Sequence, residues 1–106
     1  MEKIDWMLGM SENMMNICQK HMSDNMMMRQ MYQMSSSLIG NLNYIKLMMS
    51  NRTDMYFNLD MVENMFRNME EMMMNMDVHD ERQVKMMRSM MGYMVDMQIM
   101  MITMMR

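Results

Sequence analysis

Apolar residues recur at three- and four-residue steps along almost the whole of this chain, and that period allows little besides amphipathic helices. Four such stripes can be followed, each separated from the next by a short polar segment. We therefore predict helices at about residues 2–22, 24–49, 54–76 and 78–105. Period-2 alternation is absent and β-branched residues are scarce, so the pattern argues against strands.

Each predicted helix has one apolar stripe, which is expected to face the core. The stripes of the first two helices consist of Ile4, Met7, Leu8, Met14, Met15, Cys18 and Met22, and of Met27, Met28, Met31, Met34, Leu38, Leu42, Ile45, Met48 and Met49. Those of the last two consist of Met55, Leu59, Val62, Met65, Phe66, Met69, Met72, Met73 and Met76, and of Val84, Met87, Met90, Met91, Met94, Met97, Met101, Met104 and Met105.

The polar segments between the stripes predict turns and helix caps. Residues 23–24 offer N-cap chemistry for the second helix, and Asp77 offers it for the fourth. Residues 50–54 form the clearest turn and end in Thr53 and Asp54, which are good caps for the third helix.

Helices of about 20–27 residues joined by short loops are typical of an antiparallel up-down-up-down four-helix bundle. The chain has 106 residues, which suffices for one modest core, so we predict an all-α single domain over residues 1–106. In that topology the loops after the first and third helices lie at the same end of the bundle.

Methionine occupies most of the core-facing positions. Thirty-one residues are Met, and the chain has no Ala and no Pro. Met is flexible and specifies packing weakly, whereas Ala is the best helix former and one of the commonest residues in proteins. The composition indicates a restricted or algorithmically chosen alphabet, with Met at positions where Leu and Ala usually stand.

Polar and apolar residues placed by helical period in this way resemble artificial four-helix bundles, either binary-patterned or computationally designed. The resemblance implies a scaffold that was chosen to fold and has no evolved biochemical activity.

The chain also resembles, more faintly, the periplasmic b-type cytochrome four-helix bundle. The similarity lies in its length, its four-helix layout, Met7, the run Ser35-Ser36-Ser37-Leu38, the pair Val84-Lys85 and the terminal Arg106. In that family a Met of the first helix and a His in the last turns of the fourth helix ligate haem.

The resemblance therefore implies haem binding, with Met7 at the first ligand position. The last predicted helix has no His, and Ile102 stands where one would be needed. A haem alternative would pair Met7 with Met101 or Met104, two thioethers that anchor haem more weakly than imidazole does.

A soft-metal site is a second alternative. The bundle topology would bring Cys18, His21 and Met22 close to Met76 and His79 at one end. The spacing of Cys18 and His21 puts both on one helical face, and thiolate, thioether and imidazole ligands together select Cu(I) or Zn²⁺. The competing interpretation is that both His are ordinary polar residues and that Cys18 is a small buried apolar side chain.

Catalysis has no support in the sequence. The carboxylate pairs Glu70-Glu71 and Asp80-Glu81 are adjacent residues that point in different directions. The Glu-x-x-His motif of di-iron bundles and Gly-rich phosphate loops are both absent. We expect no enzyme activity.

Charge and hydropathy restrict the partners and the location. The net charge is −3 and the basic residues are scattered, which argues against a nucleic-acid partner. No apolar run approaches the roughly 20 residues of a membrane span, and the first residues do not resemble a signal peptide. We expect a cytoplasmic product if it is made in a cell.

The single Cys excludes an internal disulfide. Residues 26–28 and 72–74 are consecutive Met that wrap around their helices, so some thioethers must be exposed. We expect a monomer that self-associates weakly through them.

Overall fold

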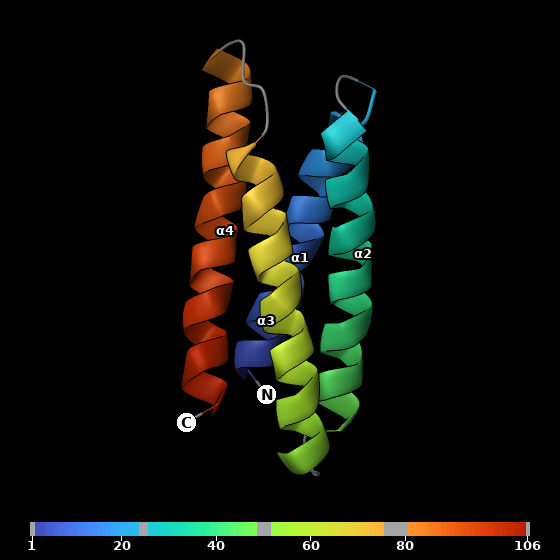
Figure 1. Cartoon of the computed structure of the whole chain (residues 1–106), viewed down its shortest axis with the longest axis vertical. Helices are drawn as coiled ribbons and strands as arrows, with labels where there is room; N and C mark the ends of the chain where they lie inside the picture. Colours follow the sequence, from blue (N-terminus) through green and yellow to red (C-terminus); the bar gives the residue numbers. More distant parts are fainter. Residues whose placement is uncertain (1, 24–25, 49–51, 76–80, 106) are drawn as a thin grey trace.

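The structure is a computed structural model that describes residues 2–23, 26–48, 52–75 and 81–105. That part of the chain is helical and contains no strand: α1 (Glu2–Lys20), α2 (Met26–Leu47), α3 (Arg52–Met74) and α4 (Glu81–Met105). The all-α prediction with four helices is confirmed (Figure 1). No described helix combines the length and the apolar character that crossing a membrane requires.

The helix ends differ from the sequence expectation by a few residues. The third helix begins at Arg52, so Thr53 and Asp54 lie within its first turn, and their assignment as caps was wrong. An acidic residue is favourable both as an N-cap and within the first turn, because the helix dipole is positive at that end. The sequence pattern alone therefore does not distinguish an N-cap position from a first-turn position. The caps predicted at residues 24 and 77 lie outside the described residues.

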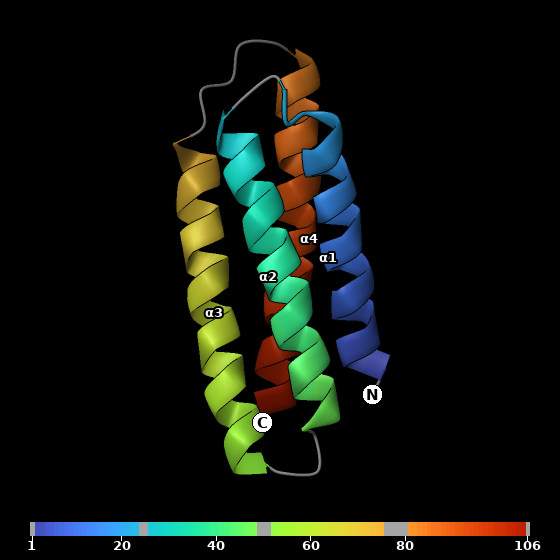
Figure 2. The same ribbon diagram turned by 90° about the vertical axis from the view of Figure 1, so that its right-hand side faces the viewer.

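The four helices pack in a ring. Within the described residues, α1 contacts α2 and α4, and α3 contacts the same two helices, while the diagonal pairs make no close backbone approach. The molecule is elongated, with extents of 45 × 21 × 20 Å. The N-terminal end of α1 and the C-terminal end of α4 lie at the same end of the molecule (Figures 1 and 2). This pairing is consistent with an antiparallel bundle.

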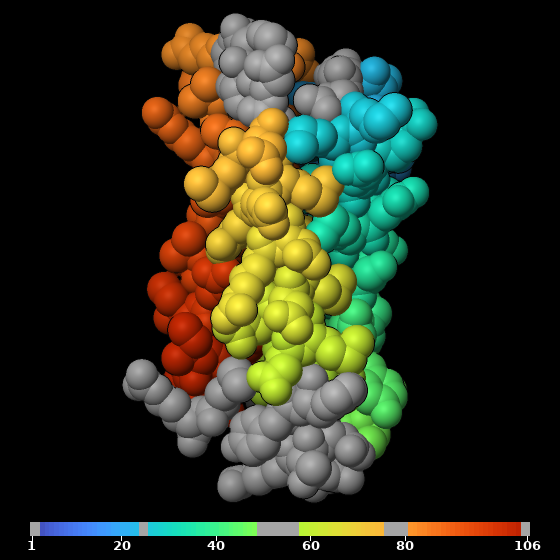
Figure 3. All heavy atoms as spheres, in the orientation of Figure 1, coloured from blue at the N-terminus to red at the C-terminus, as the bar shows by residue number. Residues whose placement is uncertain are grey.

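The core lies along the axis of this ring and is formed by the predicted stripes. Nineteen apolar side chains of the described part are buried, and eleven of them are Met. The buried Met are Met7, Met10, Met14, Met28, Met31, Met69, Met73, Met90, Met94, Met97 and Met101. On the face shown in Figure 3, the side chains of α3 lie between those of α4 and those of α2.

The core has two chemically different halves. Towards the end where α2 finishes and α3 begins, these two helices bury branched and aromatic side chains, whereas towards the other end they bury Met. The first set consists of Leu38, Leu42, Ile45, Leu59, Val62 and Phe66, and the second of Met28, Met31, Met69 and Met73. On α4 every described buried side chain is Met.

Polar contacts join each pair of neighbouring helices. One is an ion pair, one is a contact between an amide and a carboxylate, and two bring a polar side-chain atom close to a thioether sulfur. They are Lys46 Nζ to Asp5 Oδ1 (2.7 Å), Gln98 Nε2 to Glu70 Oε1, Asn41 Nδ2 to Met65 Sδ (3.3 Å) and Ser11 Oγ to Met97 Sδ (3.3 Å). These contacts help to fix the register of the helices, since each one requires particular residues to be at the same level.

Candidate functional site

The structure places part of the predicted soft-metal site. Cys18 is fully buried in the last turn of α1, and the His21 backbone N–H donates a hydrogen bond to the Cys18 carbonyl oxygen at 3.1 Å. Met22 follows in the same turn and is half-buried. Met76 and His79 lie outside the described residues. Three of the five predicted ligands are thus brought to one end of the bundle, and the structure does not place the other two.

Burial makes the Cys18 thiol a poor metal ligand near neutral pH. Desolvation by burial raises its pKa from 9.0 to about 11. The Ser35 Oγ forms no hydrogen bond within the described part of the chain. A metal would have to displace the thiol proton, because the thiolate is the ligand. Among the described residues, no three His, Cys, Asp or Glu are grouped so that they could hold a metal ion.

The two thioethers of the haem alternative lie at the same level of the core. Ser11 of α1 contacts Met97 of α4. The N-terminal end of α1 and the C-terminal end of α4 lie at the same end of the molecule (Figure 1), so Met7 and Met101 each lie one turn from this contact towards that end. Both side chains are buried among core residues, with exposed fractions of 0% and 2%. A haem between them would have to displace that packing. Ile102 is half-exposed and offers no ligand, so these residues do not fit haem.

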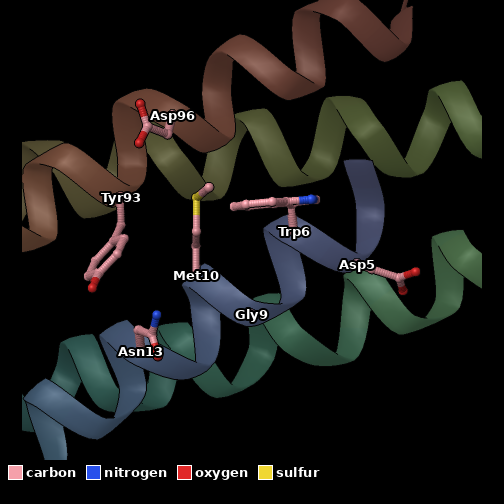
Figure 4. A pocket seen from close by; sticks show the side chains of 7 residues that line it. All are labelled: Asp5, Trp6, Gly9, Met10, Asn13, Tyr93 and Asp96. Atoms are coloured by element: carbon pink, nitrogen blue, oxygen red, sulfur yellow. The ribbon is translucent and has the colours of Figure 1, made fainter. Parts of the chain in front are cut away.

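A groove lies between α1 and α4. It has a volume of about 530 Å³ and is open to solvent. Its lining residues are Asp5, Trp6, Gly9, Met10, Asn13, Tyr93 and Asp96. Figure 4 shows the Trp6 and Tyr93 rings on either side of the Met10 side chain, with Asp96 on α4 and Asn13 on α1.

The side chains of the groove differ in how firmly they are held. Met10 is buried and forms the floor, whereas the Trp6 ring is 63% exposed. The Asp5 carboxylate points away from the other lining side chains (Figure 4) and pairs with Lys46 of α2 at 2.7 Å. No described residue forms an ion pair or hydrogen bond with the Asp96 carboxylate. The groove thus combines two aromatic rings, a thioether and one unpaired carboxylate.

Sequence reasoning missed this groove. Trp6 is the only Trp in the chain and stands outside the apolar stripe of the first helix, which was a usable signal. Tyr93 also stands outside the stripe of its helix. The two become neighbours only because of the register between α1 and α4, which depends on packing across the bundle.

A smaller hollow lies between α2 and α3. Its volume is about 280 Å³, and Met27, Asn68, Glu71, Met72 and Asn75 line it. Its lining includes no aromatic ring and combines two thioethers with two amides and one carboxylate.

No protein-family model matches this chain, and no curated protein or solved structure is significantly similar to it.

Proposed function

We propose that this chain is an artificial four-helix-bundle scaffold with up-down-up-down topology, and that its role is to fold. On this proposal it has no evolved catalytic activity and requires no cofactor. It is a monomer, with weak self-association through exposed Met such as Met26 and Met74.

The composition of the core carries this proposal. Met accounts for eleven of the nineteen buried apolar side chains in the described part. Leu, Ile, Val and Phe have better-defined rotamers and usually specify a unique core, whereas Met adapts to whatever space is left. Such a core places apolar side chains at helical spacing and buries them, but it does not specify one unique packing arrangement. That is the expected result when residues are chosen by pattern.

Circular dichroism with urea unfolding tests the scaffold proposal. We expect a helical spectrum, because the buried stripes of all four helices follow the helical period. We also expect a core that is less uniquely ordered than one of Leu, Ile and Phe, with measurable binding of a hydrophobic dye. A spectrum dominated by strand would contradict the proposal. A sharp transition without dye binding would contradict the loosely ordered core.

Cu(I) binding is the alternative function. The backbone hydrogen bond between His21 and Cys18 supports it, because it holds a thiol and an imidazole within one turn. The high pKa of Cys18 opposes it. An anaerobic Cu(I) titration should compare the wild type with a Cys18→Ser, His21→Ala, His79→Ala variant. Equal affinity in both would end the one-site alternative, and a loss confined to the variant would support it.

Haem binding is the second alternative and is tested by adding hemin. The burial of Met7 and Met101 in a filled core predicts no shift of the Soret band. A shift that Met7→Leu abolishes would contradict this expectation.

A further inference from the structure

We propose that the groove between α1 and α4 binds small organic cations, namely a quaternary or methylated ammonium group with a short polar or apolar tail. This inference goes beyond the scaffold role and does not depend on it. It rests on three properties of the groove: its aromatic rings, its charge and its size.

Two aromatic rings border the groove, one on either side of Met10 (Figure 4). Trp6 comes from α1 and Tyr93 from α4. The faces of aromatic rings attract cations electrostatically, and Trp does so most strongly. The exposed Trp6 ring is thus available to a ligand. The Met10 thioether adds a polarizable apolar floor against which methyl groups can pack.

The charge of the groove favours a cation. Its lining includes two carboxylates, Asp5 and Asp96, and no Lys or Arg. Lys46 of α2 engages Asp5, so the uncompensated charge is that of Asp96 on α4. An anionic ligand would be repelled by Asp96. A neutral ligand could at most donate a hydrogen bond to Asp96 and would lack the attraction between opposite charges.

The size of the groove fits a small ligand. A volume of about 530 Å³ lies within the range of small-molecule sites. Gly9 contributes to the open space, because a Cβ built on it would meet no atom within 4 Å. A residue with a large side chain at position 9 would therefore enter the groove without disturbing the core.

Trp6 fluorescence reports binding directly, since the chain has no other Trp. Choline should be titrated against its neutral isostere 3,3-dimethylbutan-1-ol at constant ionic strength. We expect saturable binding of choline and an affinity roughly three- to thirtyfold higher than that of the isostere, from cation–π and carboxylate attraction at an exposed site. Equal affinities, or a change in fluorescence that does not saturate, would overturn the proposal.

Two matched pairs of variants locate the site. Asp96→Asn removes the charge and should weaken choline binding about two- to fivefold, whereas Asp60→Asn, on the exposed surface of α3, should not. Gly9→Leu should abolish binding by filling the groove. Gly40→Leu is its control, because Gly40 also has open space at Cβ but lies on α2, outside the groove.

Circular dichroism of each variant establishes that it is folded. If Gly9→Leu fails to fold, the Asp96→Asn and Asp60→Asn pair decides. Unchanged binding in Asp96→Asn, or equal losses in Asp96→Asn and Asp60→Asn, would contradict a site at the groove.

Discussion

The Ser11 hydroxyl lies 3.3 Å from the Met97 sulfur and donates a 2.8 Å hydrogen bond to the Met7 carbonyl oxygen. It is a fully buried polar group that has found partners on both α1 and α4. Ser35 of α2 is equally buried, but its Oγ has no hydrogen-bond partner within the described part of the chain. The two residues therefore form a natural comparison of a satisfied and an unsatisfied buried hydroxyl.

Ser35→Ala should stabilise the protein. A buried hydroxyl without a partner costs about 1–3 kcal/mol, and Ala is also the better helix former. We expect the free energy of unfolding to rise by about 1 kcal/mol or more, measured by urea denaturation. Ser11→Ala is the matched control, and its effect should stay within about 0.5 kcal/mol because a lost contact offsets the gain in helix propensity. Destabilisation by Ser35→Ala would show that its hydroxyl is satisfied after all.

The stability of the protein should fall between about pH 9 and pH 11 as Cys18 titrates. Burial raises the pKa of this thiol from 9.0 to about 11, so the folded chain keeps a proton that the unfolded chain releases in that range. The contribution of the protonated Cys18 thiol to the free energy of unfolding is fully present below pH 9 and is lost as the pH rises towards 11. Cys18→Ala should unfold with a shallower pH dependence. The difference between the two curves is the quantity to measure, and parallel curves would refute the burial of Cys18.

Met94→Leu should stabilise the bundle. Met94 is fully buried on α4, and a buried Leu loses about 0.5–1 kcal/mol less side-chain entropy than Met does. We expect the urea midpoint to rise without a change in the denaturant slope, which corresponds to a gain of about 0.5–1 kcal/mol. Met74→Leu, at a position that is 80% exposed, should leave the midpoint unchanged. Equal shifts of the urea midpoint in both variants would contradict the prediction, because the gain would then not depend on burial.

The two halves of the core should differ in local stability. The branched and aromatic side chains around Phe66 pack in defined rotamers, whereas the half around Met28 and Met73 is dominated by Met. Native-state hydrogen exchange should therefore show faster opening for backbone amides around Met28 and Met73 than for those around Leu42 and Leu59. Uniform protection along α2 and α3 would contradict a divided core.

Helical period was sufficient to predict the four helices and most of their buried positions. It could not predict that Met10 and Ser11 are both buried. A helix in a bundle faces two neighbours, so its buried surface is wider than one narrow stripe, and the side that widens depends on which helix lies next to it. Ser35 was missed for a similar reason, since a run of serines indicates weak helix propensity but does not show which serine faces inwards.

The candidate sites depended still more on register. Cys18 and His21 could be placed together because they share one turn. Trp6 and Tyr93 are 87 positions apart in the chain and meet only through the packing of α1 on α4. Neither residue is part of a local motif, so no spacing along the chain predicts the groove.

Peroxide oxidation followed by peptide mass spectrometry tests most directly whether the methionines build the core. Peroxide converts an accessible thioether to the sulfoxide, and burial protects it. Met26 and Met74, which are 75% and 80% exposed, should be oxidised first in the folded protein. The ten Met with exposed fractions of 2% or less should react only as fast as the bundle unfolds, and all sites should react alike in denaturant. Equal oxidation rates at Met74 and Met94 in native buffer would contradict the account.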